Sequence, residues 1–180
     1  MKEINIVLTQ TNTLVSKTLK AFSKKPYNHI SISFTEDCTD MYSFGRKITW
    51  LPLPGGFVRE NINHGIFKLY PETKCKIYKL EVTDSEYNII KRRLEKFINS
   101  PERFKYSILN LVLMYFNIPL KRDYYYVCSS FVTYLLWGII PFNKEITLVV
   151  PDDYNTLELE TIYEGPLFEY VNKKIAYSHF

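Results

Sequence analysis

The stretch Tyr124-Tyr125-Tyr126-Val127-Cys128-Ser129-Ser130-Phe131-Val132 joins two different patterns of side chains. The aromatic run before Cys128 is typical of a strand. Apolar residues then recur at helical spacing until the stop signal at Gly138: Phe131, Val132, Leu135 and Leu136. The pattern predicts a strand that leads directly into a helix, with Cys128 on the first turn of that helix.

The position of Cys128 allows two interpretations. Unpaired backbone N–H groups and the helix dipole favour negative charge at a helix start, and a thiol placed there is favoured in its reactive thiolate form. Most single cysteines, however, are small buried hydrophobic residues. The choice depends on whether the chain also supplies a base.

The composition indicates one folded domain and argues against several classes of protein. The 180 residues are enough for one domain with a real core. Hydrophobic content of 46% and aromatic content of 16% exclude a disordered chain. The net charge is +4 and the Lys and Arg residues are dispersed, so we expect no nucleic-acid partner, which would require a dense basic stripe. No repeat or linker interrupts the chain, and residues 1–180 are predicted to form a single α+β domain.

Cysteine usage bears on cofactors and redox setting. The three cysteines, Cys38, Cys75 and Cys128, are odd in number and widely spaced. This spacing argues against a disulfide framework and against zinc, which needs paired ligands at short spacing. The chain also has no Gly-rich phosphate loop or metal-ligand cluster, so we expect no cofactor and no metal.

Two apolar segments bear on localisation. The N-terminal segment 1–8 turns polar at Thr9, too soon for a secretory signal. The longest apolar run, Ile108 to Phe116, is interrupted by Asn110, falls short of the ~18 residues of a membrane span, and is predicted to be a buried helix. We therefore expect a cytoplasmic setting without stable membrane insertion, and leave the oligomeric state open.

Periodicity places the other elements. Alternating side chains predict a sheet whose strands cover residues 4–8, 29–34, 41–47 and 75–82, with one or two further strands over 160–170. Helical spacing predicts helices over 14–22, 84–98, 104–118 and 128–137, the second opened by a capping box from Thr83 to Glu86. A loop is expected over 50–56, and 57–61 is ambiguous.

Among the three histidines, only His29 is placed like a base. His179 lies in the tail and His64 in a loop, whereas His29 begins a strand and shares its polar face with Ser31 and Ser33. The alternation predicts that this strand is half-buried. An imidazole titrates near neutrality and can activate a thiol within hydrogen-bond reach. The alternative interpretation is a structural histidine held by hydrogen bonds.

Four segments carry a resemblance to a known family: Tyr-Asn-His-Ile-Ser-Ile-Ser at 27–33, Met-Tyr-Ser-Phe-Gly-Arg at 41–46, Gly-Gly-Phe-Val-Arg-Glu at 55–60 and Cys-Ser-Ser-Phe-Val at 128–132. Together they resemble the circularly permuted papain-like cysteine hydrolases. This permuted branch of the NlpC-type superfamily includes bacterial YiiX-like proteins and lecithin retinol acyltransferase relatives. The histidine strand precedes the cysteine helix, which is the permuted order, and the resemblance spans residues 4 to 155.

The resemblance implies a permuted papain-like fold, an antiparallel sheet packed against helices, with a catalytic pair. Cys128 would be the nucleophile, and His29 the base and then the acid. Such families usually add a polar residue on the strand after the histidine strand, which orients the imidazole. Ser43 has the same strand parity as His29 and is the expected third residue. Three alternatives remain open: Tyr42, Asp40 and the carboxylate of Glu60.

The implied chemistry is acyl transfer through an acyl-enzyme, by a peptidase, an amidase or an acyl hydrolase. The backbone N–H of Cys128 would stabilise the oxyanion, with Tyr27 or Tyr126 as a second donor. The substrate would be a small molecule, a peptide or a lipid. The alternative is an inactive binding module on the same fold, which recognises a peptide or a lipid headgroup and in which Cys128 is only a buried residue.

Overall fold

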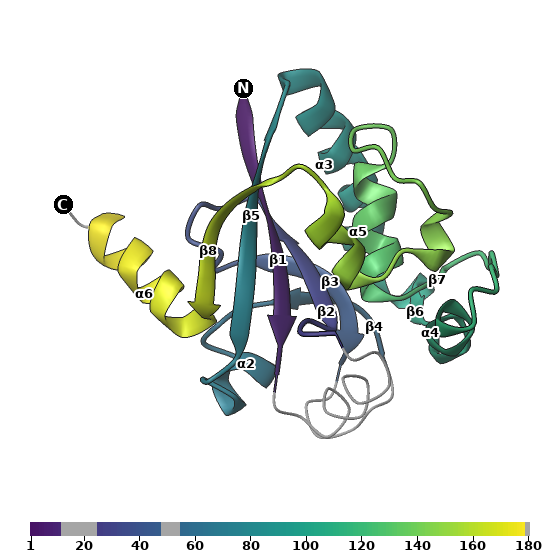
Figure 1. Cartoon of the computed structure of the whole chain (residues 1–180), viewed down its shortest axis with the longest axis horizontal. Coiled ribbons are helices and arrows are strands. Elements are labelled where there is room, and N and C mark those ends of the chain that lie inside the picture. Colours follow the sequence, from purple (N-terminus) through teal and green to yellow (C-terminus); the bar gives the residue numbers. More distant parts are fainter. Residues whose placement is uncertain (12–24, 48–54, 179–180) are drawn as a thin grey trace.

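The computed structural model describes residues 1–11, 25–47 and 55–178, which form a twisted sheet with helices on both faces (Figure 1). The strand order is β7-β6-β4-β3-β2-β1-β5-β8. Neighbouring strands are antiparallel except for the short β6–β7 pair, which is parallel. The strands are β1 (Lys2–Gln10), β2 (His29–Ser33), β3 (Met41–Arg46), β4 (Gly55–Glu60), β5 (Lys74–Val82), β6 (Lys105–Tyr106), β7 (Tyr125–Tyr126) and β8 (Glu160–Pro166).

The described helices pack on the two faces of this sheet or at its edge. They are α2 (Gly65–Leu69), α3 (Asp84–Ile98), α4 (Ile108–Tyr115), α5 (Cys128–Leu136) and α6 (Leu167–Ser178). Three 3-10 turns also occur, at Pro101–Arg103, Ile146–Leu148 and Pro151–Thr156. The predicted α+β class is therefore confirmed.

Alternation along the central strands builds the core that holds α5. One face of β1 and β2 supplies branched aliphatic side chains, and one face of α5 packs on them. All of these side chains are fully buried: Ile4, Ile6, Leu8, Ile30, Ile32, Phe131, Val132, Leu135 and Leu136. Burial of one such side chain is worth about 1.5–3 kcal/mol. The helix that begins at Cys128 is thereby fixed on the sheet.

The polar face of β2 is buried as well, which corrects the expectation of a half-buried strand. Ser31 and Ser33 are both fully buried. Ser33 donates a hydrogen bond to the carbonyl of Asp40 at 2.8 Å, so its polar group is satisfied. A second apolar cluster covers this face, and it brings in Phe67 of α2 and Tyr170 of α6.

Most of the predicted elements around the site are found. β1, β2, β3 and β5 cover the expected segments, and α3 begins with the predicted capping box, in which Thr83 accepts from the N–H of Glu86 and donates its own N–H to that carboxylate. The ambiguous segment 57–61 belongs mainly to β4. The helix expected over 14–22 and most of the loop expected over 50–56 lie outside the described residues.

The expected helix over 104–118 is wrong in extent and in environment. Its first residues form β6, and the helix α4 starts only at Ile108. Its buried residues are Asn110 and Met114, while its other side chains are half-buried or exposed. The amide of Asn110 bonds the carbonyl of Leu120 and accepts from Ser107, both at 2.6 Å. These bonds turn the polar residue inward and leave the apolar residues outside.

A second difference lies near the C-terminal end. Only β8 occupies the region where one or two strands were expected over 160–170, and α6 begins directly after it at Leu167. Leu167, Tyr170 and Val171 are spaced for one helix face, and that face is buried. Among the residues that the structure describes, no helix has the length and apolar character needed to cross a membrane.

Candidate active site

Cys128 is the first residue of α5, and local hydrogen bonds fix the start of this helix. The N–H of Val127 donates to Oγ of Ser130 at 3.0 Å, and that hydroxyl donates to the carbonyl of Val127 at 3.1 Å. The N–H of Phe131 makes the first intrahelical bond, also to Val127. The amide of Cys128 therefore belongs to the first turn, where N–H groups have no intrahelical acceptor. The cysteine itself is 5% exposed.

The imidazole of His29 is held by a carboxylate two strands away. Nε2 of His29 lies 2.9 Å from Oε1 of Glu60, the last residue of β4. The hydroxyl of Ser31 donates to the other oxygen of Glu60 at 2.5 Å. Each carboxylate oxygen thus has its own partner, which fixes the carboxylate and, through it, the orientation of the ring.

Cys128 lines the same pocket as this imidazole and affects its pKa, although the two residues are 99 positions apart in the chain (128 − 29). Burial lowers the pKa of His29, but the charge of Glu60, a hydrogen bond with Cys128 and a hydrogen bond with Glu60 raise it more. The net pKa of His29 lies well above its ordinary value of 6.5. The ring is therefore favoured in its doubly protonated form, which is the partner that a thiolate requires.

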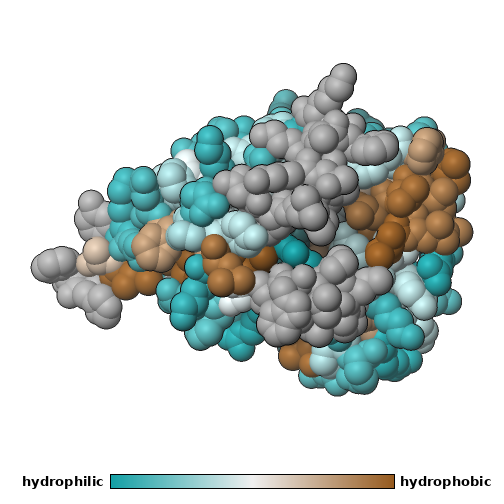
Figure 2. All heavy atoms as spheres, turned by 90° about the horizontal axis from the view of Figure 1, so that it is seen from below, coloured by the Kyte–Doolittle hydropathy of each residue, from teal (hydrophilic) through white to brown (hydrophobic). Residues whose placement is uncertain are grey.

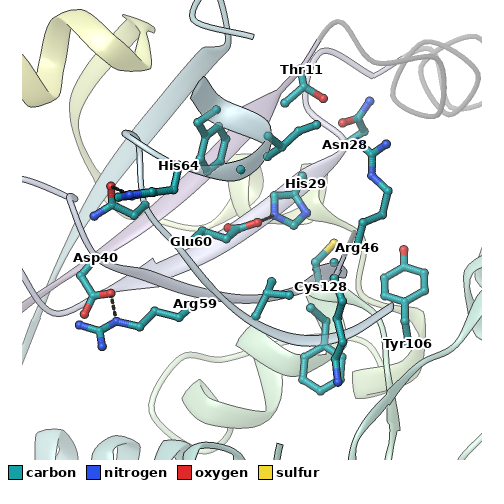
Figure 3. A pocket seen from close by; sticks show the side chains of 18 of the residues that line it. Thr11, Asn28, His29, Asp40, Arg46, Arg59, Glu60, His64, Tyr106 and Cys128 are labelled. Atoms are coloured by element: carbon teal, nitrogen blue, oxygen red, sulfur yellow. Dashed lines mark hydrogen bonds and ion pairs between the residues drawn. The ribbon is translucent and has the colours of Figure 1, made fainter. Parts of the chain in front are cut away.

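These three side chains face one pocket of about 780 Å³ (Figure 3). Figure 3 shows the ring of His29 between the carboxylate of Glu60 and the sulfur of Cys128. Gly45 of β3 also lines the pocket, and a Cβ built there would lie 3.8 Å both from Glu60 and from the His29 ring. Because Gly45 has no side chain, the space next to Glu60 and the His29 ring stays open. Apolar side chains, among them Ile108 and Leu111 of α4, also line the pocket.

The structure brings Glu60, and not Ser43, to the imidazole. The hydroxyl of Ser43 donates to the backbone carbonyl of Ile30 at 2.6 Å. The parity argument placed Ser43 on the correct face, but its short side chain is used by the backbone of the neighbouring strand. This corrects the expectation for Ser43 as the group that contacts the ring.

The other two alternatives for the third residue pair with each other. Asp40 forms an ion pair with Arg59, and the hydroxyl of Tyr42 donates to Asp40 at 3.1 Å. Asp40 therefore pairs with Arg59, as Figure 3 shows, and Tyr42 pairs with Asp40. Of the four residues considered from the sequence, Glu60 alone has a hydrogen bond to His29 within the described chain.

The expected second oxyanion donors are also placed elsewhere. The hydroxyl of Tyr27 donates to Glu164 at 2.9 Å, and Tyr126 is packed among aromatic rings that include Phe44 and Phe97. Neither lines the pocket.

A tyrosine that the sequence did not indicate, Tyr106 of β6, lines the pocket near Cys128 (Figure 3). Burial raises the pKa of Tyr106, and the charge of Cys128 raises it further, so the hydroxyl keeps its proton and can donate it in a hydrogen bond. Tyr106 was not predicted as a site residue because residues 104–118 were expected to form a helix.

The other two cysteines, Cys38 and Cys75, have surroundings unlike those of Cys128. Cys38 and Cys75 are fully buried. Burial and the charge of Asp37 raise the pKa of Cys38 to about 12, and burial together with the charge of Cys38 raises the pKa of Cys75. Both thiols are therefore protonated near neutral pH, and neither is a candidate nucleophile.

Within the described residues, no three His, Cys, Asp or Glu side chains gather in a way that could hold a metal ion. A comparison of the chain with protein-family models, with curated proteins and with solved structures finds no match. The assignment of a function therefore depends on the geometry of the site itself.

Proposed function

We propose that this chain is a cysteine hydrolase of the permuted papain-like class. The observation that carries the proposal is the line of Glu60, His29 and Cys128 in one pocket, with the cysteine on the first turn of a helix. A thiol, an imidazole and a group that orients the imidazole are the components of an activated nucleophile. The order of the elements, with the histidine strand before the cysteine helix, supports the permuted assignment.

More particularly, the reaction is hydrolysis of an amide or an ester. The thiolate of Cys128 attacks the carbonyl carbon, a C–S bond forms, and the carbonyl oxygen becomes an oxyanion. Collapse of this intermediate breaks the bond to the leaving group, which takes a proton from the imidazolium of His29. Water then attacks the thioester and gives a proton to His29, and the carboxylic acid product leaves as the thiolate of Cys128 and the imidazolium of His29 are restored.

We assign two donors to the oxyanion. The N–H of Cys128 lies on the first turn of α5, where a backbone donor and the helix dipole both favour negative charge. The hydroxyl of Tyr106 is the second donor, because it lies beside Cys128 in the pocket and keeps its proton. Loss of one such donor typically lowers kcat by about 10²–10³-fold.

The direct test is to trap the acyl-enzyme. The protein is mixed with p-nitrophenyl acetate, quenched in acid and analysed by mass spectrometry of its peptides. We expect one acetyl group on Cys128 and a burst of nitrophenol, with no acetyl group on Cys38 or Cys75. Because Cys38 and Cys75 are present in the same molecule, they serve as internal controls.

Variants separate catalysis from simple exposure. Cys128→Ala should abolish the burst, and Tyr106→Phe should slow acylation while the thiol remains alkylatable. A protein that forms no acyl-enzyme with this ester or with a panel of acyl amides, although Cys128 is alkylated normally, would leave the pocket as a binding site and the hydrolase proposal would be wrong.

A further inference from the structure

The helix α4 has an inverted distribution of polarity. Its polar Asn110 is buried and bonded, whereas large apolar side chains project from the helix and from the turn that follows it. We define the α4 patch by these residues, which are between 36% and 66% exposed: Ile108, Leu109, Val112, Tyr115, Phe116 and Ile118. Figure 2 shows apolar side chains gathered over this end of the molecule, at the right of the view. Exposed apolar clusters of this kind usually mark an interaction site.

Basic residues adjoin the α4 patch on both sides in the sequence and form what we call its basic border, while the segment 107–120 itself contains no charged residue. The neighbouring segments supply four basic residues and two acidic ones, Glu102 and Asp123. The basic residues are Arg103, Lys105, Lys121 and Arg122, and none of them forms an ion pair with a residue that the structure describes. An apolar surface with an unneutralised basic border is complementary to an anionic bilayer, which offers hydrocarbon beneath negative headgroups.

Tyrosines contact two residues of this basic border. The guanidinium of Arg103 lies 4.9 Å from the ring centre of Tyr124 and donates to its hydroxyl at 3.0 Å. The guanidinium of Arg122 lies 3.7 Å from the ring centre of Tyr125. Tyrosine and arginine side chains with an apolar body and a polar end are typical of the headgroup level of a membrane.

From these observations we propose that the α4 patch docks the protein on the surface of an anionic lipid bilayer. The apolar side chains enter the boundary between headgroups and acyl chains, and the basic border contacts the phosphates. A second copy of the chain is the poorer occupant, because a two-fold interface over the patch would place the same basic border on both sides. Docking of this kind needs no membrane-spanning helix.

The α4 patch is continuous with the pocket that contains Cys128. Ile108 belongs to the patch and also lines the pocket, together with Leu111 of the same helix. A protein docked through α4 would therefore hold the pocket close to the lipid surface. The docking proposal itself does not depend on catalysis, so it is tested on a chain that carries Cys128→Ala.

The test is co-sedimentation with vesicles of phosphatidylcholine alone or of phosphatidylcholine mixed with phosphatidylglycerol. We expect binding to the mixed vesicles that weakens as salt is added, because screening removes the electrostatic attraction. Leu109→Gln/Phe116→Gln should weaken this binding by at least about tenfold, since two apolar side chains no longer enter the lipid. Leu69→Gln/Phe168→Gln is the matched control, because it makes the same two changes at exposed residues outside the patch.

Each outcome decides the proposal. Tight binding of wild type and control, together with loss in the patch variant, supports it, and unchanged thermal unfolding shows that the variants are folded. No binding to mixed vesicles overturns it, and so does equal loss in the two double variants. A concentration-dependent dimer that dissociates in the patch variant, without vesicle binding, identifies a second copy as the occupant and also overturns it.

Discussion

Replacement of His29 by Gln is expected to lower the reactivity of Cys128 without changing that of the other thiols. Glu60 and Cys128 raise the pKa of His29, so the wild-type ring supplies the positive charge that a thiolate needs. Gln is similar in length and keeps a polar group, but it cannot carry charge. We therefore expect the variant to remove the positive charge beside Cys128 and to leave the strand in place.

The size of the effect follows from the contact that is lost. A hydrogen bond to a charged group is worth about 1.5–3 kcal/mol, and each 1.36 kcal/mol corresponds to a factor of ten. We therefore expect the rate of alkylation of Cys128 at pH 7 to fall by about ten- to a hundredfold in His29→Gln.

Cys38 sets the baseline in the same protein. With a pKa of about 12, only roughly one Cys38 thiol in 10⁵ is ionised at pH 7, against roughly 3% for an ordinary cysteine. From ionisation alone, before its lack of access is considered, we expect this buried thiol to react roughly 10³-fold more slowly than an ordinary cysteine. In wild type, Cys128 should react much faster than Cys38 and Cys75.

The assay is a time course with iodoacetamide, followed by peptide mapping of all three cysteines. The result that refutes the thiolate assignment is equal alkylation of the three thiols in the native protein. An unchanged rate for Cys128 in the folded His29→Gln variant would refute the role of the imidazole, even if Cys128 were the most reactive of the three.

Three further predictions concern the same site. Glu60→Gln should shift the alkaline limb of the pH profile of kcat/KM to lower pH, because the charge of Glu60 raises the pKa of His29. A uniform loss of activity at every pH would mean that Glu60 has a structural role only. Gly55→Ala should destabilise the protein and slow acylation, because the added Cβ would lie 2.7 Å from Cβ of Tyr106 and 3.0 Å from the carbonyl oxygen of Gly45. Unfolding in urea measures the first effect and acylation by p-nitrophenyl acetate measures the second. A variant with unchanged stability and unchanged acylation would contradict this close packing of Gly55 against Tyr106. The pKa of His29 is higher in the folded chain than its ordinary value of 6.5, so protonated His29 stabilises the fold fully below pH 6.5 and this stabilisation is lost as pH rises through the folded pKa. The free energy of unfolding in urea, measured across this range, should therefore fall in wild type and not in His29→Gln. Parallel pH curves for the two proteins would exclude this contribution of His29.

Local patterns were sufficient to predict the central strands and the start of α5. Period-two alternation identified β2 and placed His29 at its first residue, and the change of period at Cys128 identified the helix. The environment of α4 could not be predicted in this way, because an apolar run is normally buried. Only the contacts of Asn110 with Ser107 and Leu120 show why this helix turns its polar residue inward.

The third member of the site illustrates a different limit. Ser43 lies on β3, next to β2, and Glu60 lies on β4, one strand further away, and strand parity cannot tell which of the two side chains reaches the ring. The decision depends on side-chain length and on competing partners, since the hydroxyl of Ser43 is used by Ile30 while the carboxylate of Glu60 extends across to β2. Tyr106 escaped prediction because a two-residue strand such as β6 is too short to produce a periodic signal.

The parallel pair of β6 and β7 connects the start of α4 with the start of α5. Lys105 and Tyr106 pair with Tyr125 and Tyr126, and the N–H of Ser107, which caps α4, donates to the carbonyl of Tyr126 at 2.9 Å. Only Val127 separates this pair from Cys128. We therefore expect a displacement at the start of α4 to reach Cys128 through one short ladder, so that a load on the outer helix would alter the alignment of sulfur and imidazole.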